Sequence, residues 1–294
     1  MNFKKVLGAA VLLAPSFLFA QGEIIITTAK KDMSLGNKSA FVLAIPETRA
    51  KDIAEDWEKM MKKEKAKVDV NKLETKASPV LLKNVSAAPF TIFTSAMDIT
   101  GAGQLNVWVM SGDSFIVAGD STDKVAAIKK YLHDFGVQEY RNTAGNQLEA
   151  EQKKSKQLDK IYDGFVKDQK KAEEAVSDAK REIEKLQEKN KQEEGNIEKA
   201  KANKLSSNAS VGKQDNLDAQ KKTAKQVESY IKDQQRAEDN IKSNNKRIER
   251  LQQKIKEETA NADKAKNLQA PALSNADAQK TVVTVASEKL NKIK

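Results

Sequence analysis

Apolar residues form short runs with alternating stretches over the first half of the chain, and they recur at steps of three and four over the second half. The first pattern is typical of β-strands and the second of amphipathic helices. The pattern changes at residues 143–146, where the composition shifts towards Lys, Glu, Gln, Asn and Ala. We therefore predict an α+β domain over residues 21–145 and an antiparallel coiled-coil hairpin over residues 146–270.

The domain should be a compact antiparallel sheet with two helices. Apolar stripes predict one helix over residues 49–65 and a second that starts at Asp120 and is capped by Gly136. Alternation places Trp108 on the sheet face opposite Val107. Strand-like runs, separated by turn-forming Gly, Pro and Ser, lie at residues 24–26, 41–45, 80–82, 90–97, 105–110 and 115–117.

The hairpin is predicted from two apolar stripes of about equal length, separated by the helix-breaking residues 206–212. Folding about Ser210 would pair residues whose numbers sum to about 420. The first stripe is Leu158, Tyr162, Phe165, Gln169, Ala172, Val176, Ala179, Ile183, Leu186, Asn190, Glu193, Ile197 and Ala200, and the second is Val227, Tyr230, Gln234, Ala237, Ile241, Asn244, Ile248, Leu251, Ile255, Glu258, Ala262 and Ala265. This register places Ala179 opposite Ile241 and Asn190 near Tyr230.

The last segment, residues 271–294, has two interpretations. Pro271 should end the hairpin, and Ser274 with Asp277 resembles a capping box that would start a short helix. The β-branched run 281–285 suits a strand as well. We favour the helix.

The N-terminus has the pattern of a secretory signal peptide over residues 1–20, with cleavage between Ala20 and Gln21. A membrane anchor is the alternative, but the apolar run is shorter than the roughly 20 residues that a spanning helix needs. The chain contains no cysteine, which excludes a lipid-modified N-terminal cysteine and disulfides. We expect an exported protein, periplasmic or associated with the outer envelope, that is not a lipoprotein and whose mature chain has no transmembrane span.

A formal net charge of +10 is compatible with a polyanionic partner such as nucleic acid or a charged membrane face. Residues 21–145 carry 17 basic and 16 acidic side chains, and residues 146–294 carry 33 and 26. We interpret the excess as a mildly basic solvated surface and not as a focused patch. The basic half has few aromatic side chains, so nucleic-acid binding is not expected.

Candidate chemistry is sparse. His133 is the sole histidine, which excludes sites built on several histidines, and it more plausibly borders an apolar stripe than acts as a base. The glycines at 101 and 103 and the segment 36–39 lack the remaining parts of nucleotide-binding loops and suit hairpin turns. Paired carboxylates are expected on any charged helix. We predict no enzyme activity, no catalytic residue, no cofactor and no metal.

The favoured function is a non-enzymatic interaction scaffold or adaptor, with the hairpin as a spacer that presents its tip to an envelope protein; association of copies through the hairpin is possible. The tip residues are Ser206, Ser207, Asn208, Ser210, Val211 and Gly212. The alternative is a holdase, because the hairpin resembles, in general architecture, the periplasmic arm-bearing chaperones of outer-membrane protein biogenesis. A hairpin like those of export-pump adaptors is disfavoured because it follows a complete domain, and a cell-wall hydrolase lacks histidines for zinc.

Overall fold

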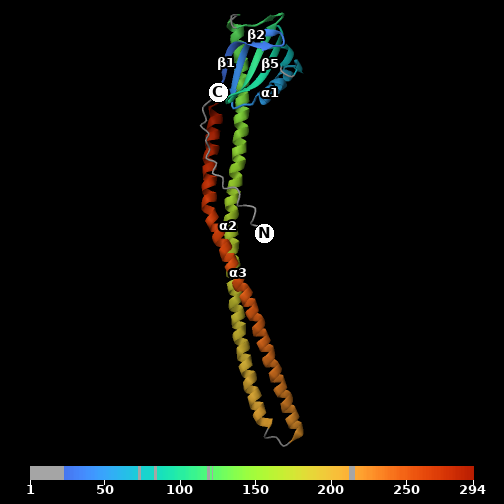
Figure 1. Ribbon diagram of the computed structural model, residues 1–294, viewed down its shortest axis with the longest axis vertical. Helices are drawn as coiled ribbons and strands as arrows, with labels where there is room; N and C mark the ends of the chain where they lie inside the picture. Colours follow the sequence, from blue (N-terminus) through green and yellow to red (C-terminus); the bar gives the residue numbers. More distant parts are fainter. Residues whose placement is uncertain (1–22, 72–73, 83–84, 118–119, 121, 212–215) are drawn as a thin grey trace. The chain divides into compact units, whose positions relative to one another are not determined.

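The chain divides into two compact units. The first unit contains residues 1–155 and 278–294, and the second unit contains residues 156–277. The predicted signal peptide and its cleavage site lie outside the described residues. The computed structural model describes residues 23–71, 74–82, 85–117, 120, 122–211 and 216–294 (Figure 1).

The predicted fold class is confirmed: an antiparallel sheet with helices is followed by a long helical hairpin. The sheet has the strand order β1-β2-β6-β5-β4-β3, with β7 also paired to β6. The elements are β1 (Ile25–Met33), β2 (Gly36–Pro46), α1 (Ala50–Lys63), β3 (Lys67–Asn71), β4 (Glu74–Val80), β5 (Phe90–Ile99), β6 (Ala102–Ser111), β7 (Ser114–Phe115), α2 (Thr122–Val211) and α3 (Leu217–Lys292).

The main core lies between one face of the sheet and the helices α1 and α2 (Figure 1). Leu43 and Val107 of the sheet are buried against Trp57 of α1 and Leu132 of α2. Trp108 points to the opposite face, as the alternation predicted, and is only 1% exposed. It packs there with Ala40, Val42 and Phe93. The centre of this opposite face is therefore buried as well, by side chains of the sheet itself.

The polar edge of the sheet departs from the prediction. Strand β3 was missed, and β4 ends at Val80 instead of starting there. Both strands are rich in polar residues, mainly Lys, Glu, Asp and Thr. β3 is an edge strand, and most of its side chains are exposed. An edge strand with one solvated face needs few apolar residues, so periodicity gave little signal.

The second predicted helix is the start of a much longer one. Helix α2 runs without interruption through Gly136 and through residues 143–146 to Val211. Gly136 does not cap it: a Cβ there would lie 3.0 Å from Ile24 Cγ2 and 3.1 Å from Leu43 Cδ1, so the glycine lets the helix approach the sheet. Asp120 does not cap the first turn either, and its carboxylate accepts the Val117 N–H at 2.7 Å.

The end of α3 belongs to the first unit. The prediction that Pro271 ends the hairpin was wrong, because α3 continues through it to Lys292. Pro271 removes one backbone donor, and buried Ala272 and Ala276 on the next turns keep the helix packed. At its end, Ile293 joins the main core and its carbonyl accepts two hydrogen bonds from Arg141, at 3.2 and 2.9 Å.

The hairpin has a different register from the predicted one. Asn190 contacts Asn244 and Asn245, with side-chain hydrogen bonds of 2.8 and 2.7 Å, and does not lie near Tyr230. Asn240 likewise donates to Glu193 at 2.9 Å. The numbers of Asn190 and Asn244 sum to 434, not 420. The pairing of Ala179 with Ile241 is therefore wrong as well.

The helix break was placed too early. Residues 206–211 continue α2, and α3 begins at Leu217. Serine is tolerated there because the Ser210 hydroxyl donates to the Ser206 carbonyl at 3.0 Å, a bond that serines make within helices. The turn therefore falls after Val211, which moves the register.

Candidate functional site

A groove of about 620 Å³ lies between α1 and α2 in the first unit. Two carboxyl groups face each other there, Asp56 from α1 and Glu139 from α2. Glu139 is 4% exposed and shares a hydrogen bond with Asp56. The Lys59 ammonium donates to Asp56 at 2.5 Å, so the nearby cation is engaged by the more exposed member of the pair.

The pKa of Glu139 is raised to about 7, chiefly by burial and also by the Asp56 carboxylate beside it, against the opposing effect of Lys59. A carboxyl that holds a proton near neutral pH is the kind of group that general acids use. Glu139 was not predicted from the sequence. Its signal is the spacing, because Glu139 continues the buried stripe of Leu132 and Phe135 at steps of three and four.

Tyr131 borders the same groove. Burial raises the pKa of its hydroxyl, with a further contribution from Glu64. The hydroxyl oxygen is buried, and it has no hydrogen-bond partner within the described residues. Its ring meets Trp57 edge-on, with 6.3 Å between the ring centroids. The tyrosine therefore acts mainly as part of the apolar wall.

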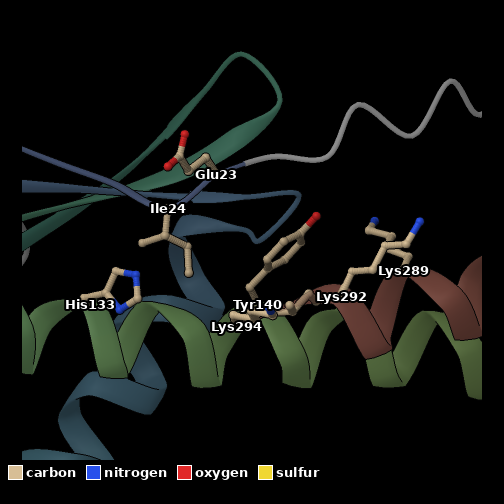
Figure 2. A pocket seen from close by; sticks show the side chains of 8 residues that line it. Glu23, Ile24, His133, Tyr140, Lys289, Lys292 and Lys294 are labelled. Carbon is tan, nitrogen blue, oxygen red and sulfur yellow. The ribbon is translucent and has the colours of Figure 1, made fainter.

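A second pocket, of about 400 Å³, lies where the start of the sheet meets α2 and the end of α3 (Figure 2). Lys289 forms an ion pair with Glu47 and lies over the Tyr140 ring, with 5.5 Å to the ring centroid. Glu47 also accepts a bond from Gln147 at 3.3 Å. These contacts hold the end of α3 within the first unit, so Lys289 has a structural role.

His133 lines this pocket but lies away from the groove that holds Glu139. Its side chain is 47% exposed, and its Nδ1 is 3.9 Å from an Asp134 oxygen. This position at the margin of the buried stripe matches the one predicted. Among the described residues, no group of three or more His, Asp or Glu side chains is arranged to hold a metal ion.

The predicted partner-binding tip is part of the hairpin end, which we define as residues 199–225. The structure places Ser206, Ser207, Asn208 and Ser210 on the last two turns of α2, together with Val211, whose side chain lies outside the description, as does Gly212. Leu205 and Leu217 were not predicted as part of the tip; they are 76% and 65% exposed, the highest values among the large apolar side chains that the structure describes. Both leucines lie off the apolar stripes, and this is the sequence feature that could have indicated their exposure.

The hairpin end also concentrates positive charge, which corrects the interpretation of an evenly spread excess. Residues 199–225 carry seven lysines and two aspartates, whereas the rest of 146–294 carries 26 basic and 24 acidic side chains. Counting over the whole region hid this because the lysines come from two segments that are separate in sequence, at the end of α2 and the start of α3. The lysines with a described position are Lys199, Lys201, Lys204, Lys221, Lys222 and Lys225.

Comparison with protein-family models, with curated proteins and with solved structures finds no match to this chain. Within the described residues, no helix combines the length and apolar character needed to cross a membrane. Function therefore has to be argued from the geometry of the two units.

Proposed function

We propose that this chain is a non-enzymatic, exported protein of the cell envelope that acts as an interaction scaffold. The first unit holds a protein partner, and the hairpin is a spacer that presents its end to a second component of the envelope. The single observation that carries the proposal is the inward-facing seam of the hairpin. Leu186 is 5% exposed and Ala179 is 2% exposed, so these seam residues are buried between the arms, although Ile161 and Ile231, which lie off the seam, are 46% and 41% exposed.

The outer faces of the arms support the spacer role. They carry charged side chains that pair along the surface, as in Arg181 with Asp178 and Lys232 with Glu228. At about 1.5 Å per residue, an arm from residue 156 to 211 rises about 80 Å. A helical pair of this length keeps its ends apart without requiring an apolar client.

The test is photocrosslinking in the native cell envelope, followed by mass spectrometry. A photoreactive residue at Val70, which is 64% exposed on the edge strand β3, samples the first unit. A second at Lys246, exposed in the middle of α3, is the matched control on the arms. We expect one reproducible protein partner at Val70 and none at Lys246.

A broad set of unfolded outer-membrane barrel proteins captured at Lys246 would overturn the scaffold proposal and establish the holdase alternative. Absence of any reproducible protein at Val70 and at other exposed positions of the first unit, such as Leu35, would also count against the scaffold. Leu35 is 52% exposed in the turn between β1 and β2.

A further inference from the structure

The sheet of the first unit ends in two edge strands, of which β1 is the longer. β1 spans nine residues, Ile25–Met33, and pairs with β2 along its whole length. Among the described strands, none pairs with its other side, and none of its nine side chains is buried. The outer edge of β1 therefore presents a row of backbone donors and acceptors that another strand can bind.

The opposite edge is protected against such pairing, whereas the first half of β1 is not. β3 has only five residues, and two of them, Lys67 and Asp69, are charged. Short length and charged side chains are the usual means by which edge strands avoid pairing with other molecules. Residues 25–29 of β1 contain no charge, no proline and no bulge, and the charges begin only at Lys30. Ile25 in this half is 53% exposed.

Alternate residues of an antiparallel strand direct their backbone N–H and C=O groups to opposite sides. Residues 34–35 form the turn between β1 and β2. The pair that closes a two-residue turn exchanges hydrogen bonds, and here that pair is Met33 with Gly36. The odd-numbered residues of β1 therefore bond to β2, and even-numbered residues such as Ile26 and Thr28 direct their backbone groups outward.

β1 and the residue that precedes it by two positions carry opposite charges on the sheet face away from the main core. Lys31 lies directly opposite Lys38 of β2, and like charges placed in this way repel each other. A carboxylate on the outer side of Lys31 would offset this repulsion. Figure 2 shows the Glu23 carboxylate pointing away from α2 and Ile24 pointing towards it. Glu23 therefore lies on the same face as Lys31.

A second copy of β1 supplies this carboxylate in one antiparallel register. Two strands related by a two-fold axis make every contact twice. When Ile26 exchanges its outward hydrogen bonds with Thr28 of the second copy, Glu23 lies opposite Lys31 of the second copy. The symmetry forms this ion pair twice. Thr27 then lies opposite Thr27 of the second copy, at the axis.

We infer that two copies of this chain associate through the outer edges of β1, antiparallel about Thr27, and form one continuous sheet. The second strand covers the exposed Ile25, and each Glu23 pairs with a Lys31. A register centred on Thr28 would place Lys31 opposite Ile25 and would lose both ion pairs. The inference concerns the first unit alone and does not depend on the scaffold proposal.

Single cysteines test the register in the chain from Gln21 onward, which has no cysteine of its own. Cα atoms that lie directly opposite each other are about 4.5–5.5 Å apart, within the range of a disulfide. Thr27→Cys should therefore form a covalent dimer under mild oxidation, measured on a non-reducing gel. Ala29→Cys, which would meet its own copy only in a register shifted along the strand, should stay monomeric. The matched control on the other edge strand is Val70→Cys, which is exposed and should also stay monomeric.

Sedimentation equilibrium measures the association itself, and we expect the unmodified chain to form dimers. Lys31→Glu should raise the dissociation constant about tenfold or more, because two ion pairs become two like-charge pairs. Adding Glu23→Lys to this variant should restore the original dissociation constant.

A proline at the edge separates pairing with a second copy from pairing with β2. Thr28→Pro removes an outward N–H group, which an edge strand tolerates. It should abolish the dimer and leave the first unit folded. Near-ultraviolet circular dichroism of the buried Trp57 and Trp108 measures the folding of the unit.

A chain that stays monomeric up to about 1 mM would overturn the inference. Covalent dimers of Ala29→Cys without those of Thr27→Cys would overturn the register, and a double charge variant that fails to recover would overturn the ion pair. If Thr28→Pro stayed folded and dimeric, the copies would associate elsewhere and the inference would fail. The scaffold proposal would stand in each case, because photocrosslinking at Val70 tests it separately.

Discussion

At the scale of single residues, Glu139 gives the first unit a defined pH dependence. Its pKa is raised to about 7 in the folded chain and is near 4.5 for an ordinary glutamate. Between about pH 4.5 and pH 7 the folded state binds more protons at this group than the unfolded state does. Stability from this group is therefore fully present below about pH 4.5, falls as the pH rises, and is lost above about pH 7.

Replacing Glu139 with glutamine removes this titration and keeps the size of the side chain. We expect Glu139→Gln to match the wild type at pH 4.5 and to be about 2 kcal/mol more stable at pH 8, measured by urea unfolding. The control is Glu149→Gln, because Glu149 is solvated and its pKa is lowered by Lys153. A difference between Glu139→Gln and the wild type that does not change with pH would contradict the assignment.

Two glycines of the first unit should respond in opposite directions to the same substitution. A Cβ on Gly103 would lie 2.4 Å from Ile53 Cδ1 and 2.6 Å from the Thr48 carbonyl oxygen, so Gly103→Ala should destabilise by about 3 kcal/mol. A Cβ on Gly145 meets nothing within 4 Å in the interior of α2. Gly145→Ala should stabilise by about 0.5–1 kcal/mol. Thermal unfolding of both variants checks the pair, and equal effects would contradict it.

At the scale of elements, the apolar pattern predicted most of the sheet and both arms of the hairpin but not their register. The observed sum of 434 differs from the predicted 420 by 14 residues, which is two heptads. When one arm shifts along the other by whole heptads, seam residues still lie opposite seam residues. Periodicity therefore cannot distinguish the two registers. The position of the turn distinguishes the two registers. It was predicted from serines that were expected to break the helix, but the helix accommodates them through the hydrogen bond from the Ser210 hydroxyl to the Ser206 carbonyl.

The candidate sites were less predictable than the elements, for a related reason. Glu139 is important because Asp56, on another helix, faces it, and pairing between α1 and α2 is invisible in one sequence. The contribution of Lys289 depends on Glu47 in the same way. Leu205 and Leu217 were visible as apolar residues off the stripes, but their exposure requires the fold.

The register gives a direct test in the second unit. Because Asn190 and Asn244 are joined by a 2.8 Å side-chain hydrogen bond, cysteines at both positions should oxidise readily to an intramolecular disulfide. Cysteines at Ala179 and Ile241 belong to the register that the structure excludes and should not form one. Non-reducing gel mobility of the two double variants measures the outcome, and crosslinking of the second pair alone would contradict the observed register.

At the scale of the whole molecule, the first unit is built from both ends of the chain. Residues 278–294 follow the hairpin in sequence but pack in the first unit, where Ile293 is 8% exposed in the main core and Lys289 pairs with Glu47. Removing these residues would expose apolar surface and leave Glu47 without its cation. Together these losses amount to a few kcal/mol, against a total domain stability of about 5–15 kcal/mol.

We therefore expect residues 23–155 alone to lose native packing, and residues 23–155 joined to 278–294 by a short Gly-Ser linker to keep it. A short linker suffices because Gln279 Nε2 lies 3.3 Å from the Glu151 carbonyl oxygen. Near-ultraviolet circular dichroism of the buried Trp57 and Trp108 reports the packing. A native signal from residues 23–155 alone would show that the C-terminal segment is dispensable, and a lost signal in the linked protein would show that the first unit needs the hairpin.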